Sequence, residues 1–158
     1  MLRIKLALLA VATAMALPAQ TYNGHGYAYF GIDKPAHASM SEAMTVGGGG
    51  EAFAYKGLAA GVELGYMFPR GYFREGIGLV SVWPSYHFVN RKRPAKLVPF
   101  VTAGYTLAFR QGTENLWHWG GGVTYWFHNR IGTRVEVRDY RHDQYWFDTA
   151  LRFGLTFR

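Results

Sequence analysis

The chain has 158 residues and no cysteine, so disulfide bonds cannot supply its stability. Its formal net charge is +7, but Lys and Arg are scattered rather than clustered, which argues against a nucleic-acid-binding protein. Aromatic residues make up 17% of the chain and glycine occurs 20 times, while no segment after residue 20 keeps a helical apolar period. This combination is typical of an all-β protein.

The start of the chain has the features of a secretory signal peptide. Arg3 and Lys5 form a short basic region, and residues 6–17 are an uncharged apolar run that is too short to span a membrane as a helix. Small residues follow at a cleavable position. The sequence therefore predicts a signal peptide at residues 1–19 and a single exported domain at residues 20–158.

Eight segments of this domain read as strands, because they are rich in aromatic and β-branched residues and are separated by polar, Gly- or Pro-containing breaks. They span residues 22–32, 43–55, 58–68, 76–89, 97–109, 116–128, 131–140 and 145–158. The breaks after the second and sixth segments are short, and those after the first, third, fifth and seventh are longer. This alternation is typical of an antiparallel, up-and-down transmembrane β-barrel. Pro84, inside the fourth segment, predicts a bulge or a strand end.

The two faces of these segments differ in a way that predicts their orientation. One face carries large apolar residues such as Leu64, Val135 and Phe153, and the other carries Gly, Ala and Thr with a few charged residues. A narrow barrel needs small residues inside, and aromatic residues near strand ends match the girdles at membrane interfaces. We therefore expect the apolar face to point outward, towards lipid. The alternative is a soluble, lipocalin-like carrier, in which the same face would point inward.

Charged residues on the inward face must pair, because an unpaired buried ion costs several kcal/mol. The sequence predicts a structural ion-pair network in the lumen that contains Glu63, Arg134, Glu136, Arg138 and Arg152. Glu51 is a further candidate if its segment keeps its register through the glycines. The network would fill the barrel; the alternative is a small selective pore.

No metal site and no cofactor are predicted. The chain contains no His-x-His and no HExxH motif, and His118 and His128, both expected inside the sixth segment, are too far apart along a strand to share an ion.

The stretches VPFVTAGYTLAF, WHWGGGVTYWF and RIGTRVEVRDYR resemble the small outer-membrane β-barrel family related to the outer-membrane protein A barrel and the opacity porin-like proteins. The resemblance implies a monomer in a bacterial outer membrane, surrounded by outer-membrane lipids and lipopolysaccharide. It also implies assembly by the barrel-insertion machinery. Such barrels usually end on an aromatic residue, whereas Phe157 here is followed by Arg158.

The expected function is a structural or surface-interaction role rather than catalysis. An alternative is a lipid A-modifying enzyme of the deacylase type, which carries His-x-Ser on a strand. The chain has His37-Ala38-Ser39, but in a predicted loop, and it has Ser85 and His87 in the reverse order on a predicted strand. A small pore is the other alternative. The longer loops, with Arg, Lys, His and Tyr, suit binding to phosphate- or carboxylate-bearing sugars.

Overall fold

The computed structural model of the protein describes residues 24–34, 42–89, 96–142 and 146–158. The predicted signal peptide at residues 1–19 and the motif His37-Ala38-Ser39 lie outside these described residues. Within the described part of the chain, no helix has the length and apolarity needed to cross a membrane.

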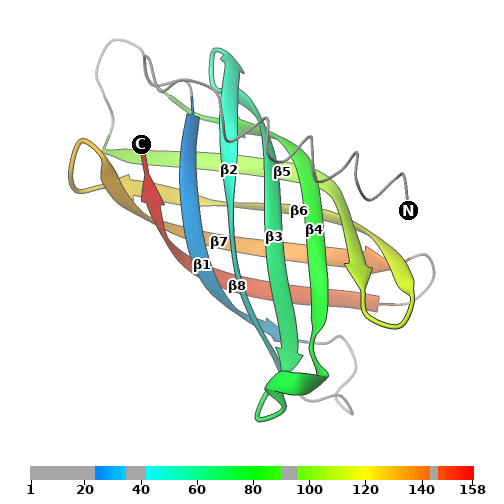
Figure 1. The fold of residues 1–158 in the computed structure, drawn as a ribbon. Helices are drawn as coiled ribbons and strands as arrows, with labels where there is room; N and C mark the ends of the chain where they lie inside the picture. The colour runs from blue at the N-terminus through cyan, green and yellow to red at the C-terminus, as the bar shows by residue number, and fades with distance from the viewer. Residues whose placement is uncertain (1–23, 35–41, 90–95, 143–145) are drawn as a thin grey trace.

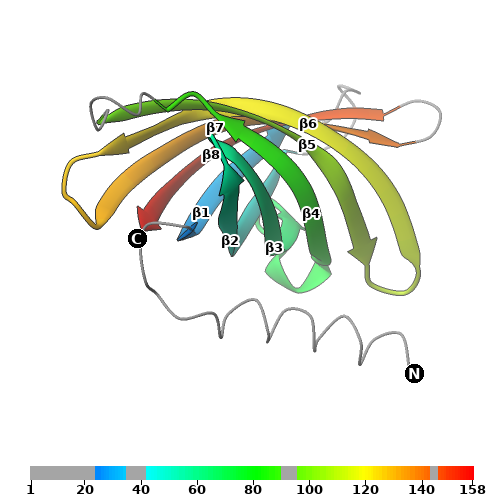
Figure 2. The same cartoon turned by 90° about the horizontal axis from the view of Figure 1, so that it is seen from above.

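The described residues form one closed, eight-stranded antiparallel barrel, which confirms the predicted fold class (Figure 1, Figure 2). Each strand pairs with its neighbour in sequence, and β1 pairs with β8 to close the sheet. The strands are β1 (Gly24–Lys34), β2 (Ala43–Tyr55), β3 (Leu58–Pro69), β4 (Ile77–His87), β5 (Leu97–Phe109), β6 (Thr113–Trp126), β7 (Ile131–His142) and β8 (Trp146–Phe157), with a short 3-10 helix η1 (Phe73–Glu75) between β3 and β4.

The apolar face points outward, as its composition predicts. Leu64 is 51% exposed while its neighbour Glu63 is 1% exposed, and Val135 and Phe153 likewise face the outside. A strand sends successive side chains to opposite faces. Once one residue of a strand is known to point outward, the direction of every other side chain in that strand follows. The soluble-carrier alternative requires the opposite arrangement and is wrong.

The lumen also holds large aromatic side chains, which corrects the expectation that only small and charged residues lie inside. Inward-facing and buried are Tyr27, Tyr29, Trp83, Phe100, Trp126 and Tyr140. Glycines at the paired positions of neighbouring strands make room for two of them, with Gly47 opposite Tyr29 and Gly61 opposite Trp83. A Cβ at Gly47 would lie 2.7 Å from the Tyr29 hydroxyl, and one at Gly61 would lie 2.5 Å from the Trp83 ring. The inward glycines of β2 and β3 therefore leave the space that these rings occupy.

The boundaries of β6 differ from the prediction. The strand begins at Thr113 rather than Leu116, because the ladder with β5 continues to the pair Thr113↔Phe109. It ends at Trp126, so His128 is exposed beyond it rather than inside the lumen.

The predicted alternation of short and long connections holds for the first three connections and is wrong from the fourth onward. The connection at 110–112 is short, and the barrel end that carries the tight turn at 56–57 also carries the longer connection at 88–96. The polar composition of residues 113–115 predicts a loop, but these residues continue the antiparallel ladder with β5.

Pro84 neither ends β4 nor creates a bulge. Its side chain faces outward, and β4 continues to His87. Pairing with β5 runs from Gly78 to Val82 and resumes in the same register at Ser85. The missing N–H therefore interrupts one ladder locally without shifting it.

Candidate functional site

The structure brings the predicted lumen residues together at the centre of the barrel. Arg134, Glu136 and Arg138 share the inward parity of β7, and the register of β7 with β8 places Glu136 opposite Arg152. Glu63 reaches the same region from β3. None of the five side chains is more than 3% exposed.

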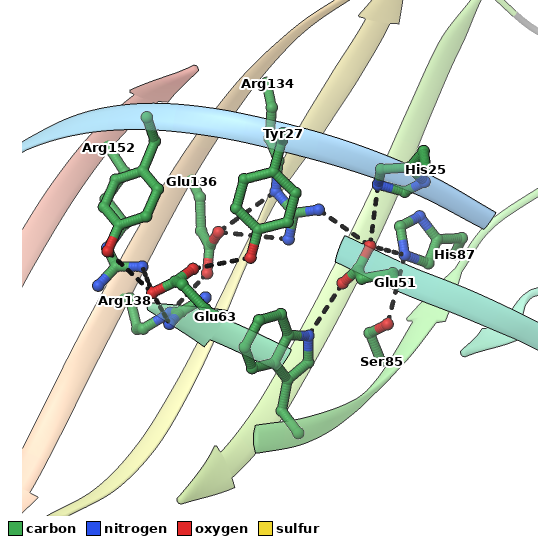
Figure 3. Close-up of polar contacts among 12 residues, drawn as sticks. His25, Tyr27, Glu51, Glu63, Ser85, His87, Arg134, Glu136, Arg138 and Arg152 are labelled. Atoms are coloured by element: carbon green, nitrogen blue, oxygen red, sulfur yellow. Dashed lines mark hydrogen bonds and ion pairs between the residues drawn. The ribbon is translucent and has the colours of Figure 1, made fainter. Parts of the chain in front are cut away.

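Glu63 is the first of two carboxylates on which the lumen contacts converge (Figure 3). It accepts hydrogen bonds from the hydroxyl groups of Tyr27 at 2.7 Å and Tyr29 at 2.9 Å. It also pairs with Arg138 at 3.2 Å and with Arg152 at 2.8 Å. Two cations and two hydroxyl donors from β1, β7 and β8 are thus fixed by one side chain of β3.

Glu136 links the guanidinium groups on either side of it along β7. Its Oε1 accepts from Arg138 Nε at 2.7 Å, and its Oε2 lies 3.3 Å from both Nε and Nη2 of Arg134. The two flanking arginines are like charges on one face of a strand. The carboxylate between them therefore offsets a repulsion that would otherwise be buried.

Glu51 is the second convergence point, and it does join the network. Arg134 lies 3.0 Å from its Oε2, as do the Nε2 atoms of His25 and His87, and Trp83 donates to Oε1 at 2.9 Å. The sequence does not predict that His25 and His87 belong to this network. The alternation of side chains along each strand identifies both histidines as inward-facing. His25 lies on the same face of β1 as Tyr27, and His87 lies on the same face of β4 as Trp83.

The network is balanced in formal charge, with three carboxylates facing three guanidinium groups when both histidines are neutral. Aromatic rings cover the cations: Arg134 lies 3.8 Å from the Phe100 ring centroid and Arg152 lies 4.4 Å from that of Tyr29. Pairing and ring contact together replace the water that these ions lose on burial. Chemically, this arrangement fills and braces the lumen.

Ser85 and His87 do contact each other, at 3.3 Å between Oγ and Nε2. The same Nε2 atom lies 3.0 Å from Glu51. A Ser-His-acid relay uses one ring nitrogen for the serine and the other for the acid, so this contact lacks the relay geometry. Ser85 is also buried in the lumen rather than placed at a rim.

His118, from the predicted pair of β6 histidines, lies inside the barrel and contacts the Thr106 hydroxyl through Nδ1 at 2.9 Å. Over the described ranges, no group of three or more His, Cys, Asp or Glu side chains is placed to hold a metal ion.

The barrel is similar to several solved structures of small β-barrels. The barrel superposes with the N-terminal β-barrel domain of Pseudomonas aeruginosa OprF at a TM-score of 0.63, with 17% identity over 87% of this chain and 100% of that one. For neisserial surface protein A the TM-score is 0.60, with 12% identity over 85% and 96%. For Ail, the attachment invasion locus protein of Yersinia pestis, it is 0.54, with 10% identity over 85% and 97%.

A de novo designed transmembrane β-barrel also matches, at a TM-score of 0.60 and 15% identity over 87% of this chain and 97% of that one. No protein-family model matches the chain, and no curated protein matches it either. The protein therefore has the fold of the small, eight-stranded transmembrane barrels, and the resemblance that its sequence predicted is confirmed at the level of the fold. Sequence identities this low support a shared fold and no shared function.

Proposed function

We propose that the protein is a bacterial outer-membrane barrel with a structural or surface-interaction role and a lumen that does not conduct. The observation that carries this proposal is the combination of an apolar outer face with a lumen closed by its own ion pairs. Arg138 is fully buried between Glu63 and Glu136, where a water-filled path would have to pass. A side-chain-filled interior is what a barrel of eight strands allows.

The barrel end opposite the start of β1 and the end of β8 is the proposed outer surface. There the connection between β3 and β4 carries the exposed rings of Tyr72 and Phe73. This connection is held in place: Tyr66 donates to the Phe73 carbonyl at 2.7 Å, and Arg110 donates to the carbonyls of Glu75 at 2.7 Å and Arg74 at 3.3 Å. Exposed aromatic rings beside guanidinium groups suit the boundary between acyl chains and phosphate groups, so lipopolysaccharide is the proposed partner.

The lipid-modifying alternative has little support, because the described Ser-His pair is buried and lacks the relay geometry. The pore alternative has little support because Arg138, Glu63 and Glu136 occupy the path that water and ions would take through the lumen. The proposed role is accordingly carried by the outside of the barrel and its loops, with the lumen network as the brace that keeps the barrel closed.

Membrane insertion and conductance test the proposal together. We expect the refolded protein to need detergent or lipid for solubility, to migrate faster in an unheated gel than after boiling, and to give no conductance steps in planar bilayers. A protein that stays monomeric in plain buffer would contradict the membrane assignment. Regular conductance steps would contradict the closed lumen. A changed acyl count in lipid A from cells that produce the protein would favour the enzyme instead.

A further inference from the structure

The exposed charges at one end of the barrel are all positive. This is the end at which β1 begins and β8 ends (Figure 1). Exposed there, within the described part of the chain, are four cations that we call the basic rim: Lys56, Lys96, Arg130 and Arg158. No described Asp or Glu side chain is exposed at this end, whereas the opposite end carries both signs and pairs Arg70 with Glu42 at 3.6 Å.

Backbone contacts hold three of the rim residues close together. The Arg158 N–H donates to the Arg130 carbonyl at 3.0 Å, and the Trp126 N–H donates to the Lys96 carbonyl at 2.7 Å. The Arg158 guanidinium in turn lies 3.7 Å from the Trp126 ring centroid. Lys96, Arg130 and Arg158 therefore gather around the end of β6.

The described residues leave this charge without a counter-ion. Lys56, Lys96 and Arg130 form no ion pair with any residue in the described ranges. The carboxylates of the lumen network are buried and paired with guanidinium groups of their own. A cavity of about 330 Å³ lies inside this end and is lined both by rim residues such as Lys56 and by His25 and His87 of the network. Clustered exposed cations of this kind attract an anion from outside the protein.

The outer surface beside the rim is aromatic. Large exposed rings lie at this end of the barrel on Tyr55, Tyr86, Phe88, Tyr125 and Phe127. The Lys56 ammonium lies 4.7 Å from the Tyr55 ring centroid, and Arg130 follows Phe127 by three residues in the turn between β6 and β7. Aromatic rings mark the boundary between acyl chains and water, and cations directly beyond such a boundary lie at the level of lipid phosphate groups.

We propose that the basic rim binds the headgroups of anionic phospholipids in the leaflet at this end of the barrel. The phosphate groups lie at Lys96 and Arg130, and the acyl chains run along the outer face of β6 and β7, over Tyr125 and Thr133, which are partners in the ladder. Lipid A also carries phosphate groups, but in the proposed orientation it lies in the opposite leaflet. This inference rests on the proposed membrane location and not on lipopolysaccharide binding at the other end.

The test measures which lipid lies next to each end of the barrel. Since the chain has no cysteine, a single introduced cysteine can carry a bimane dye. Thr133→Cys places the dye on the outer face near the basic rim, and Ile32→Cys places it on the outer face near the other end. Brominated acyl chains quench the dye, so mixed bilayers in which either phosphatidylglycerol or phosphatidylcholine is brominated give the relative affinity for the anionic lipid at each position.

We expect a preference for phosphatidylglycerol of about fivefold at Thr133, the attraction of roughly one cation near an anionic surface. Raising NaCl from 0.1 M to 1 M should lower the preference below about twofold, because the screening length falls from about 10 Å to about 3 Å. No preference at Thr133, in a protein that shows the heat-shifted gel band and does not conduct, would overturn this inference and leave the proposed function standing.

Substitutions then locate the contact. Lys96→Gln combined with Arg130→Gln should lower the preference at Thr133 below about twofold and leave that at Ile32 unchanged. Lys56→Gln, in the turn between β2 and β3 on the other side of the barrel, is the matched control and should leave the Thr133 value unchanged. A preference that survives the double substitution, or an equal loss at both dye positions, would contradict binding at the rim. Stronger displacement of brominated phosphatidylglycerol from Thr133 by lipid A than by unbrominated phosphatidylglycerol would assign this end to lipopolysaccharide and would also overturn the inference.

Discussion

Replacing Glu63 by Gln tests whether the lumen network holds the barrel together. The substitution keeps the size and one carbonyl acceptor but removes the charge that Arg138 and Arg152 share. Three buried guanidinium groups would then face two carboxylates. Arg138 keeps its 2.7 Å contact with Glu136, whereas the only ion pair of Arg152 among the described contacts is the one with Glu63.

The expected loss is large because the stranded charge is buried. Breaking one buried ion pair from one side typically costs about 3–5 kcal/mol. The hydrogen bonds from Tyr27 and Tyr29 weaken as well, because a neutral amide accepts less strongly than a carboxylate. We therefore expect Glu63→Gln to lower the free energy of unfolding by at least 3 kcal/mol on this scale.

The assay is reversible urea unfolding in lipid vesicles, followed by tryptophan fluorescence. The matched control is Glu42→Gln, which removes only an exposed pair with Arg70 at 3.6 Å and should cost about 1 kcal/mol or less. Adding Arg152→Met to Glu63→Gln should recover part of the loss, because it removes the stranded cation. A loss for Glu63→Gln no greater than that of the control would refute the reasoning.

Three further substitutions are checked by the same unfolding measurement. Val137→Lys, on the outer face at the middle of β7, should lower the free energy of unfolding in a bilayer by about 2–4 kcal/mol. Leu58→Lys, at the start of β3, should lower it by only about 0–1 kcal/mol. Equal losses for the two variants would contradict a lipid-facing outer surface. Gly122→Ala should cost about 1–3 kcal/mol, because its Cβ would lie 2.0 Å from the Val135 carbonyl oxygen, whereas at Gly26 the nearest atom is 3.7 Å away and alanine should be tolerated. Thr124→Val should leave stability unchanged or raise it by about 1 kcal/mol, since it removes a buried hydroxyl without a partner; a clear loss would show that the hydroxyl is already satisfied.

Much of the barrel follows from local alternation. The inward parity of Glu63 and of the three charged residues of β7 is readable from sequence, because side chains alternate with period two along any strand. Strand ends are less readable. Thr113 belongs to β6 because a neighbouring strand is there to pair with it, and His128 lies outside for the corresponding reason.

The contacts across the lumen are a different matter, since they depend on how the sheet closes. Parity alone places Glu51 and Glu63 inside, but it does not say which cations each one meets. His25 meets Glu51 because the two residues are partners in the register of β1 with β2. Arg134 is 83 residues away from Glu51 in the chain and reaches it across the lumen, because β1 pairs with β8 and closes the barrel.

The sequence by itself thus determined an all-β chain, the direction in which each face points and the set of charges that need partners. These are properties of neighbouring residues and of composition. Only the tertiary structure decided that the charges form a network around two carboxylates, that rings such as Trp83 occupy the space left by glycines on paired neighbouring strands, and that a cavity remains at one end. The network and the cavity depend on distances across the lumen, which closure of the barrel fixes. The contact of Trp83 with Gly61 depends on the register of the neighbouring strands β3 and β4, which local pattern does not determine either.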